Sequence, residues 1–140
     1  MKEALKNEYD DVEVGTVFSF TRTISEEHVQ SFAKLSGDFN PLHVDKKFGS
    51  ESKFGGNIVH GMLMASLFST LMGMYCPGEK CLYLSQNIQF KKPMFYGETI
   101  EIRGTILKKV DALKMIKVLT EVYRGEDLLL TGEANAQFIN

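Results

Sequence analysis

The stretch that decides the fold is Met62–Tyr75, which reads MLMASLFSTLMGMY. Its side chains are apolar almost all round, which is typical of a helix enclosed by other structure rather than one lying on a surface. It is shorter than the ~20 residues that a membrane span needs, and Ser66 and Ser69 interrupt it. Pro77-Gly78 ends the pattern. The stretch therefore predicts a long helix buried at the centre of the protein, and no membrane partner.

The chain after this helix has the alternating pattern of strands. In one segment, Ile100, Ile102 and Ile106 fall on one face and polar side chains on the other, as in a strand with one buried face. Four strands are predicted: Cys81–Lys92, Thr99–Ile106, Leu113–Arg124 and Asp127–Ile139. Their short connections imply antiparallel pairing. The simplest packing wraps this sheet around the central helix, which predicts an α+β fold.

A strand and a helix are predicted before the central helix. Thr16–Thr23 is rich in β-prone residues and predicts the strand. Ser25 is a typical N-cap and Gly37 a typical helix stop, so a helix is expected between them. This helix delivers Asp38 immediately beyond its C-terminus. Further along, Asp45 is placed to cap a short helical turn.

Asp38 and His43 lie five positions apart in a segment that reads SGDFNPLH, from residue 36 to residue 43. Pro41 fixes its own φ and pushes Asn40 out of the helical region. We therefore expect the pair on a stiff, irregular loop rather than on a regular helix. Histidine titrates near neutrality, and a nearby aspartate can orient it or share a proton with it. The pair could thus polarise one bound water from two sides.

Each of these residues has an ordinary structural interpretation when taken alone. An aspartate after a helix commonly caps a turn, and a single histidine is commonly a partly buried structural residue. Together in one segment, and followed downstream by His60-Gly61, they favour a catalytic site. His60 itself is expected to be a packing or hydrogen-bonding residue at the start of the central helix, and His28 an exposed helix residue.

Composition narrows the classes of protein that fit. The 140 residues are expected to form one domain, 1–140, and the apolar and charged fractions of 44% and 24% are ordinary for a globular protein. A net charge of −2 provides no electrostatic case for nucleic acid, so partners are expected to be small molecules or another subunit. Cys76 and Cys81 lack the spacing of a zinc site, and no metal is predicted. Met1–Val14 lacks a secretory pattern, which makes the cytoplasm the expected location.

Three segments resemble one known family in the expected order. They are Phe32–Asp45 (FAKLSGDFNPLHVD), Ile58–Leu63 (IVHGML) and Phe90–Glu98 (FKKPMFYGE). With them, nearly the whole chain resembles the MaoC-like (R)-specific enoyl-CoA hydratase family. One departure is Gly49, where the family usually has alanine or serine, at a position that is not catalytic. The resemblance implies a hot-dog fold, in which an antiparallel sheet wraps around a long buried helix.

The resemblance also implies a reaction. It is the hydration of a trans-2-enoyl-CoA to the (R)-3-hydroxyacyl-CoA, or the reverse dehydration, on short to medium acyl chains by a carbon-oxygen lyase. Such chemistry needs a base for water, an acid for the α-carbon and a donor to the thioester oxygen. Asp38 and His43 supply the first two in either order, and the Gly61 N–H at the helix start supplies the third. The resemblance adds Ser69 as an assisting hydroxyl, and no metal or redox cofactor is needed.

Three alternatives keep a similar pocket. A 3-hydroxyacyl-[acyl-carrier-protein] dehydratase would use the same Asp38 and His43 pair on another carrier. A hot-dog thioesterase would activate water against the carbonyl carbon, and the intact spacing of the pair counts against it. A non-catalytic acyl-CoA-binding protein would have no use for the pair. Exposed sheet edges and the resemblance both imply a homodimer, with higher assemblies still possible.

Overall fold

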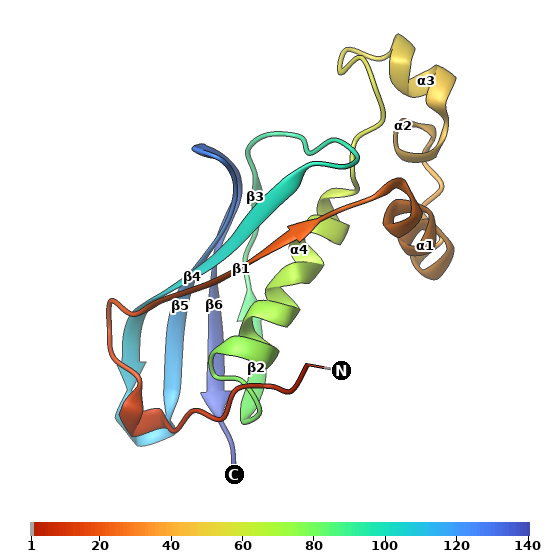
Figure 1. The fold of residues 1–140 in the computed structure, drawn as a ribbon. Coiled ribbons are helices and arrows are strands. Elements are labelled where there is room, and N and C mark those ends of the chain that lie inside the picture. The colour runs from red at the N-terminus through yellow and green to blue at the C-terminus, as the bar shows by residue number, and fades with distance from the viewer. Residues whose placement is uncertain (1) are drawn as a thin grey trace.

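The computed structural model describes residues 2–140, and in it an antiparallel sheet curves around one central helix (Figure 1). Helix α4 spans Gly61–Thr70, and the π-helical segment η2, Leu71–Tyr75, continues it. The helix thus covers the stretch predicted from its apolar pattern. No helix within residues 2–140 is long and apolar enough to cross a membrane.

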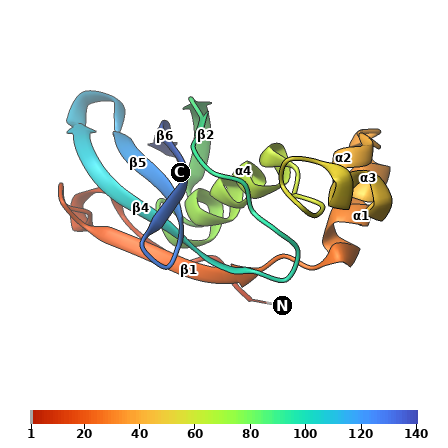
Figure 2. The same ribbon diagram turned by 90° about the horizontal axis from the view of Figure 1, so that it is seen from above.

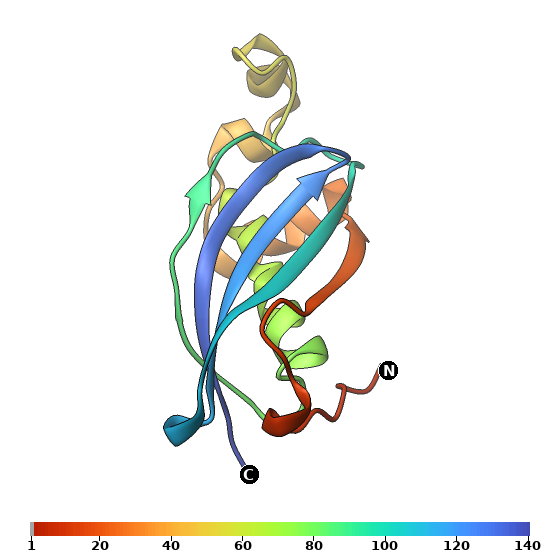
Figure 3. The ribbon, with the colours of Figure 1, turned by 90° about the vertical axis from the view of Figure 1, so that its left-hand side faces the viewer.

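The sheet has six strands, all paired antiparallel. The order across the sheet is β1 (Val17–Thr23), β4 (Thr99–Val110), β5 (Met115–Arg124), β6 (Asp127–Phe138) and β2 (Cys81–Gln86), while β3 (Gln89–Phe90) also pairs with β6. A 3-10 turn, η3 (Asp111–Leu113), joins β4 to β5, and another, η1 (Tyr9–Asp11), precedes β1. Figure 3 shows β4, β5 and β6 crossing in front of α4. The predicted α+β hot-dog arrangement is confirmed.

The core lies between α4 and the concave face of the sheet. Phe68 and Leu71 on the central helix belong to one buried cluster with Ile100 and Ile102 of β4. Ile106, the third residue of the predicted apolar face, is also buried. The alternation of β4 is confirmed, and it explains why the sheet closes on this helix: both elements place their apolar side chains in the same layer.

The single chain does not enclose α4 completely, contrary to the sequence expectation. Met62, Ser66 and Ser69 are exposed. These positions recur at the spacing of one helix face, so they form a stripe along α4 that the sheet does not cover. The small polar members of this stripe are the interruptions already visible in the sequence. We call Met62, Ser66 and Ser69 the open stripe of α4.

The segment predicted as one strand over Cys81–Lys92 is two strands, β2 and β3. Asn87 lies between them, and its side-chain Oδ1, rather than its backbone carbonyl, accepts the Glu133 N–H at 3.0 Å. Its carbonyl then approaches β6 so closely that a Cβ on Gly132 would lie 1.9 Å from that oxygen. The break therefore depends on a glycine far away in the sequence, which strand periodicity does not reveal.

Three short helices gather at one end of the molecule, beyond the end of the sheet (Figure 2). They are α1 (Glu26–Ser36), α2 (Pro41–Val44) and α3 (Lys46–Glu51). The predicted caps of α1 are confirmed: the Ser25 hydroxyl accepts the His28 N–H, and Gly37 closes the helix at φ 81°. Asp45 accepts the Phe48 N–H at 2.9 Å and caps α3 as expected.

Replacing Phe68 with alanine is expected to lower the free energy of unfolding by about 3–5 kcal/mol, because this ring is fully buried and leaves a cavity that neighbours fill only in part. Chemical denaturation measures the change. Leu35→Ala is the matched control, since Leu35 is 86% exposed and its loss is expected to cost less than about 0.5 kcal/mol. Equal midpoints for the two variants would contradict the described core.

Candidate active site

Asp38 lies in the turn that follows α1. Its N–H donates to the Ser36 hydroxyl at 3.2 Å, and its Oδ1 accepts the Asn40 N–H at 3.1 Å. These bonds hold the carboxyl group in an Asx-type turn, while its side chain stays 50% exposed. The turn forms because Gly37 adopts the left-handed conformation and ends α1. One carboxylate oxygen thus orders the loop, and the other, Oδ2, lies 4.0 Å from the His60 Nε2.

His43 lies on the short helix α2, so the expectation of an irregular loop is wrong for this half of the pair. Pro41 occupies the first turn, where a missing N–H costs nothing, and Asn40 caps the helix by accepting the Leu42 N–H at 3.0 Å. The His43 Nδ1 lies 2.8 Å from the Ile58 carbonyl oxygen. Because a carbonyl only accepts, Nδ1 carries the proton and the neutral ring keeps its lone pair on Nε2.

His60 joins the two predicted residues from the other side. It precedes α4, is 2% exposed, and donates from Nε2 to the Asp38 carbonyl oxygen at 3.0 Å. Its ring stacks on that of His43, with centroids 4.0 Å apart and planes 30° apart. The expectation of a packing or hydrogen-bonding histidine is confirmed. Its contact with both members of the pair was not foreseen, because nothing local to His60 signals it.

The same three side chains are a candidate metal centre by composition, since one donor atom from each of Asp38, His43 and His60 lies within 4.8 Å of the others. Their geometry does not fit a metal well. The two imidazole rings stack with centroids 4.0 Å apart, and the His43 Nδ1 is already bonded to the Ile58 carbonyl oxygen. The His60 Nε2 is also engaged with a carbonyl oxygen. The arrangement suits proton transfer better than coordination at the ~2.0–2.1 Å that a zinc–histidine bond requires.

Asp38, His43 and Gly61 all line one cavity of about 430 Å³. Its remaining wall is largely apolar and includes Phe90 and Met94. Met62 and Met64 of α4 also line it, and thioether side chains adapt to irregular apolar ligands. Lys91 and Lys92 also line it.

Gly61 is the first residue of α4, where a helix leaves its N–H groups without intrahelical partners. A Cβ at this position would lie 2.7 Å from the Phe90 ring. Because Gly61 has no side chain, the Phe90 ring can pack against it and a ligand can approach its N–H. Ser69, by contrast, is exposed about 12 Å further along the helix axis and is not among the lining residues of this cavity. The chain brings three of the four predicted residues together, and not the fourth.

Comparison with known proteins gives a consistent family. A model described as "MaoC like domain" matches residues 11–126. An (R)-specific enoyl-CoA hydratase of Aeromonas caviae is 42% identical, covering 88% of this chain and 92% of the relative. A mitochondrial 3-hydroxyacyl-[acyl-carrier-protein] dehydratase of Arabidopsis thaliana is 30% identical, covering 89% and 76%.

Solved structures agree with the sequence relatives. The (R)-hydratase from A. caviae involved in PHA biosynthesis has a TM-score of 0.88 at 36% identity, covering 91% of this chain and 98% of its own. An R-hydratase from Pseudomonas aeruginosa in the unliganded form also has a TM-score of 0.88, at 30% identity, covering 93% and 84%. The motifs, the hot-dog architecture and these relatives lead to one conclusion: the chain belongs to the MaoC-like family, among relatives that include (R)-specific enoyl-CoA hydratases.

Proposed function

We propose that this protein catalyses the (R)-specific addition of water to a trans-2-enoyl-CoA, and the reverse dehydration of the (R)-3-hydroxyacyl-CoA. The observation that carries the proposal is the placement of Asp38, His43 and Gly61 on one cavity, with the His43 Nε2 lone pair left free by the bond from Nδ1 to the Ile58 carbonyl. The 42% identical hydratase of A. caviae supports it.

The proposed reaction uses one water held between Asp38 and His43. One of the pair removes a proton from this water as its oxygen bonds to the β-carbon of the enoyl group. The double-bond electrons move toward the thioester, and the negative charge that develops on its oxygen is stabilised by the Gly61 N–H. The other member of the pair then protonates the α-carbon. Either residue can fill either role, because both can hold or release a proton in such a site.

Addition of water transfers no electrons to or from the substrate overall, so the proposed reaction requires no redox cofactor, and we propose that it uses no metal. The conjugated thioester itself is the electron acceptor, which the Gly61 N–H assists. We propose that residues 1–140 carry out this reaction as one domain in the cytoplasm. A cavity of about 430 Å³ with methionine and aromatic walls favours short to medium acyl chains.

Coenzyme A is the preferred carrier in this proposal, and an acyl carrier protein is the alternative. One relative named for CoA chemistry is 42% identical and two others are 30% and 32% identical, while the two mitochondrial relatives named for the carrier protein are 30% and 32% identical. Assaying crotonyl-CoA and crotonyl-acyl carrier protein side by side decides between them: kcat/KM is expected to be higher for crotonyl-CoA. Release of free thiol in place of loss of the enoyl absorbance would indicate a thioesterase.

We propose a homodimer formed through the exposed edge strand β2. This strand has a neighbour on one side only, and Leu82 and Leu84 on it are 42% and 45% exposed. Unpaired backbone groups beside exposed leucines favour pairing with a second copy. A dimer also offers cover for the open stripe of α4.

The double variant Leu82→Lys/Leu84→Lys is expected to shift the protein from dimer to monomer, because like charges would then face one another across paired edges. Light scattering after gel filtration measures the mass. Val17→Lys is the control, since Val17 is 57% exposed but lies on β1, at the opposite edge of the sheet from β2. A double variant that keeps the wild-type mass would contradict pairing through this edge.

A further inference from the structure

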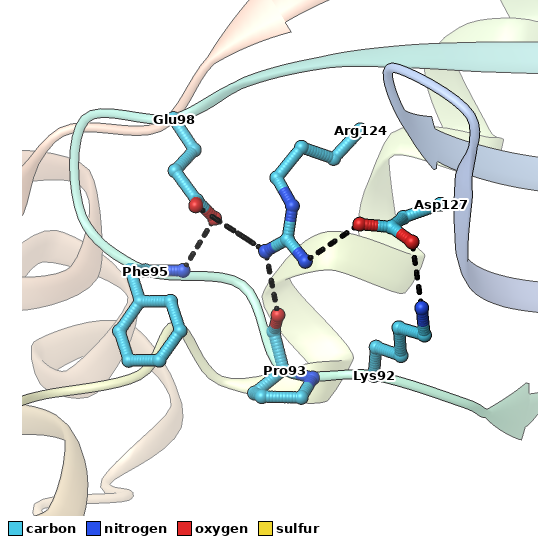
Figure 4. Close-up of polar contacts among 6 residues, drawn as sticks. All are labelled: Lys92, Pro93, Phe95, Glu98, Arg124 and Asp127. Atoms are coloured by element: carbon cyan, nitrogen blue, oxygen red, sulfur yellow. Dashed lines mark hydrogen bonds and ion pairs between the residues drawn. The ribbon is translucent and has the colours of Figure 1, made fainter. Parts of the chain in front are cut away.

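A network of charged side chains contacts the backbone that forms one wall of the cavity (Figure 4). Arg124, at the end of β5, donates from Nη1 to the Pro93 carbonyl oxygen at 3.1 Å and to Glu98 Oε2 at 3.0 Å. The same Glu98 oxygen accepts the Phe95 N–H at 2.8 Å. The network therefore joins the β5–β6 hairpin to the segment between β3 and β4 that lines the cavity.

These bonds grip the backbone on both sides of Met94. The carbonyl before this residue is held by Arg124, and the N–H after it is held by Glu98. Arg124 and Glu98 also form an ion pair with one another, so their two contacts to the backbone are coupled. Met94 itself is 1% exposed and lines the cavity. Its backbone is thus held on both sides, in addition to the bridge that pairs Phe95 with Ile58.

Met94 transmits this position to the start of α4. Its carbonyl oxygen accepts the Val59 N–H at 2.8 Å, and Val59 is two residues before Gly61. A displacement of Met94 would therefore move Val59 and, with it, the short backbone segment that ends at the Gly61 N–H. The distance over which an oxyanion donor acts is short, since donors work at 2.7–3.1 Å from the developing charge.

Two further charges keep Arg124 in place. Asp127 accepts from Arg124 Nη2 at 3.4 Å and from Lys92 Nζ at 2.6 Å. Hydrogen bonds from Lys92 and Arg124 lower the pKa of the Asp127 carboxyl group, while the bond to Glu98 raises the pKa of Arg124. The charges of the two groups thus persist over the pH range in which a hydratase is assayed.

We propose that Arg124, acting with Glu98, is a positioning residue that sets the place of the Gly61 N–H relative to the substrate cavity. This inference rests on the proposed function. It assigns the ion pair a role in the transition state in addition to its contribution to stability, since a pair only about a quarter exposed also supports the fold and its bonds to the backbone around Met94 lead to the Gly61 N–H.

Arg124→Met is expected to lower kcat for crotonyl-CoA hydration by about 10-fold with KM changed less than about threefold, because an oxyanion donor acts in the transition state. Arg103→Met is the matched control: it removes an ion pair with Glu101 of similar exposure on β4, away from the cavity, and is expected to leave kcat within about twofold. Arg124→Lys keeps one charge and is expected to lose less activity than Arg124→Met. Equal kcat values for Arg124→Met and Arg103→Met would overturn the inference.

Amide hydrogen exchange tests the link between Arg124 and the Gly61 segment without an activity assay. Exchange across residues 58–62 is expected to quicken in Arg124→Met and to match wild type in Arg103→Met. If Arg124→Met does not fold, Arg124→Lys replaces it in both measurements. Unchanged exchange in the Arg124 variant overturns the positioning role. A wild-type protein without hydratase activity would overturn the proposed function instead. Because the exchange measurement does not depend on activity, the two failures can be told apart.

Discussion

His43→Gln is expected to lower kcat for hydration of crotonyl-CoA by about 10³-fold, because an amide cannot accept and return a proton at neutral pH. Glutamine is close to histidine in size and can still donate to the Ile58 carbonyl oxygen, which the His43 Nδ1 contacts at 2.8 Å. KM is expected to change little, since the apolar wall of the cavity is intact. Steady-state kinetics, followed by loss of the enoyl absorbance, measures both constants.

The matched control is His28→Gln on α1. His28 is exposed, and its Nδ1 accepts the Ser25 N–H in the capping box, a role that glutamine also fills. This variant is expected to retain wild-type kcat. Asp38→Asn is expected to behave like His43→Gln, since its amide oxygen can keep the bond to the Asn40 N–H while the carboxylate is lost. Activity above about a tenth of wild type in either site variant would contradict the paired role.

Gly61→Ala is expected to lower kcat/KM by about 10²-fold with a small effect on stability. The added Cβ would lie 2.7 Å from the outer edge of the Phe90 ring, which is 54% exposed and can swing away. The ring then enters the cavity that it lines, and the new methyl group crowds the approach of the thioester oxygen to the N–H. Loss of one oxyanion-hole donor lowers kcat by a similar factor in acyl-transfer enzymes.

A double-mutant cycle separates the two causes. Phe90→Leu shortens the clashing side chain, so Gly61→Ala/Phe90→Leu is expected to recover part of the loss that comes from the displaced ring. The part that remains measures the crowding of the N–H itself. A Gly61→Ala protein with wild-type kcat/KM would show that the start of α4 does not approach the substrate.

Local signals in the sequence were enough for the elements with regular periodicity or clear caps. Ser25 and Gly37 bounded α1 because capping depends on residues within one turn. The apolar run of α4 and the isoleucine alternation of β4 predicted the core, since burial repeats with the geometry of each element. The family resemblance then placed Asp38 and His43 in one site.

Features that depend on distant residues could not be predicted. The stacking of His60 on His43 requires two helices to meet, and the grip of Arg124 on Pro93 joins residues 31 positions apart. The break at Asn87 depends on Gly132 across the sheet. The helix at Pro41 was missed for another reason: the same ring that disfavours a helix interior suits its first turn, and only Asn40 as a cap distinguishes the two cases.

The stereochemistry of the product tests the central claim most directly. Purified protein is incubated with crotonyl-CoA, and the 3-hydroxybutyryl group is resolved into its enantiomers after hydrolysis. We predict that the (R) enantiomer forms almost exclusively, and that its formation falls in parallel with kcat in Asp38→Asn and His43→Gln. An (S) or racemic product, or (R) product formed equally well by both variants, would contradict the account.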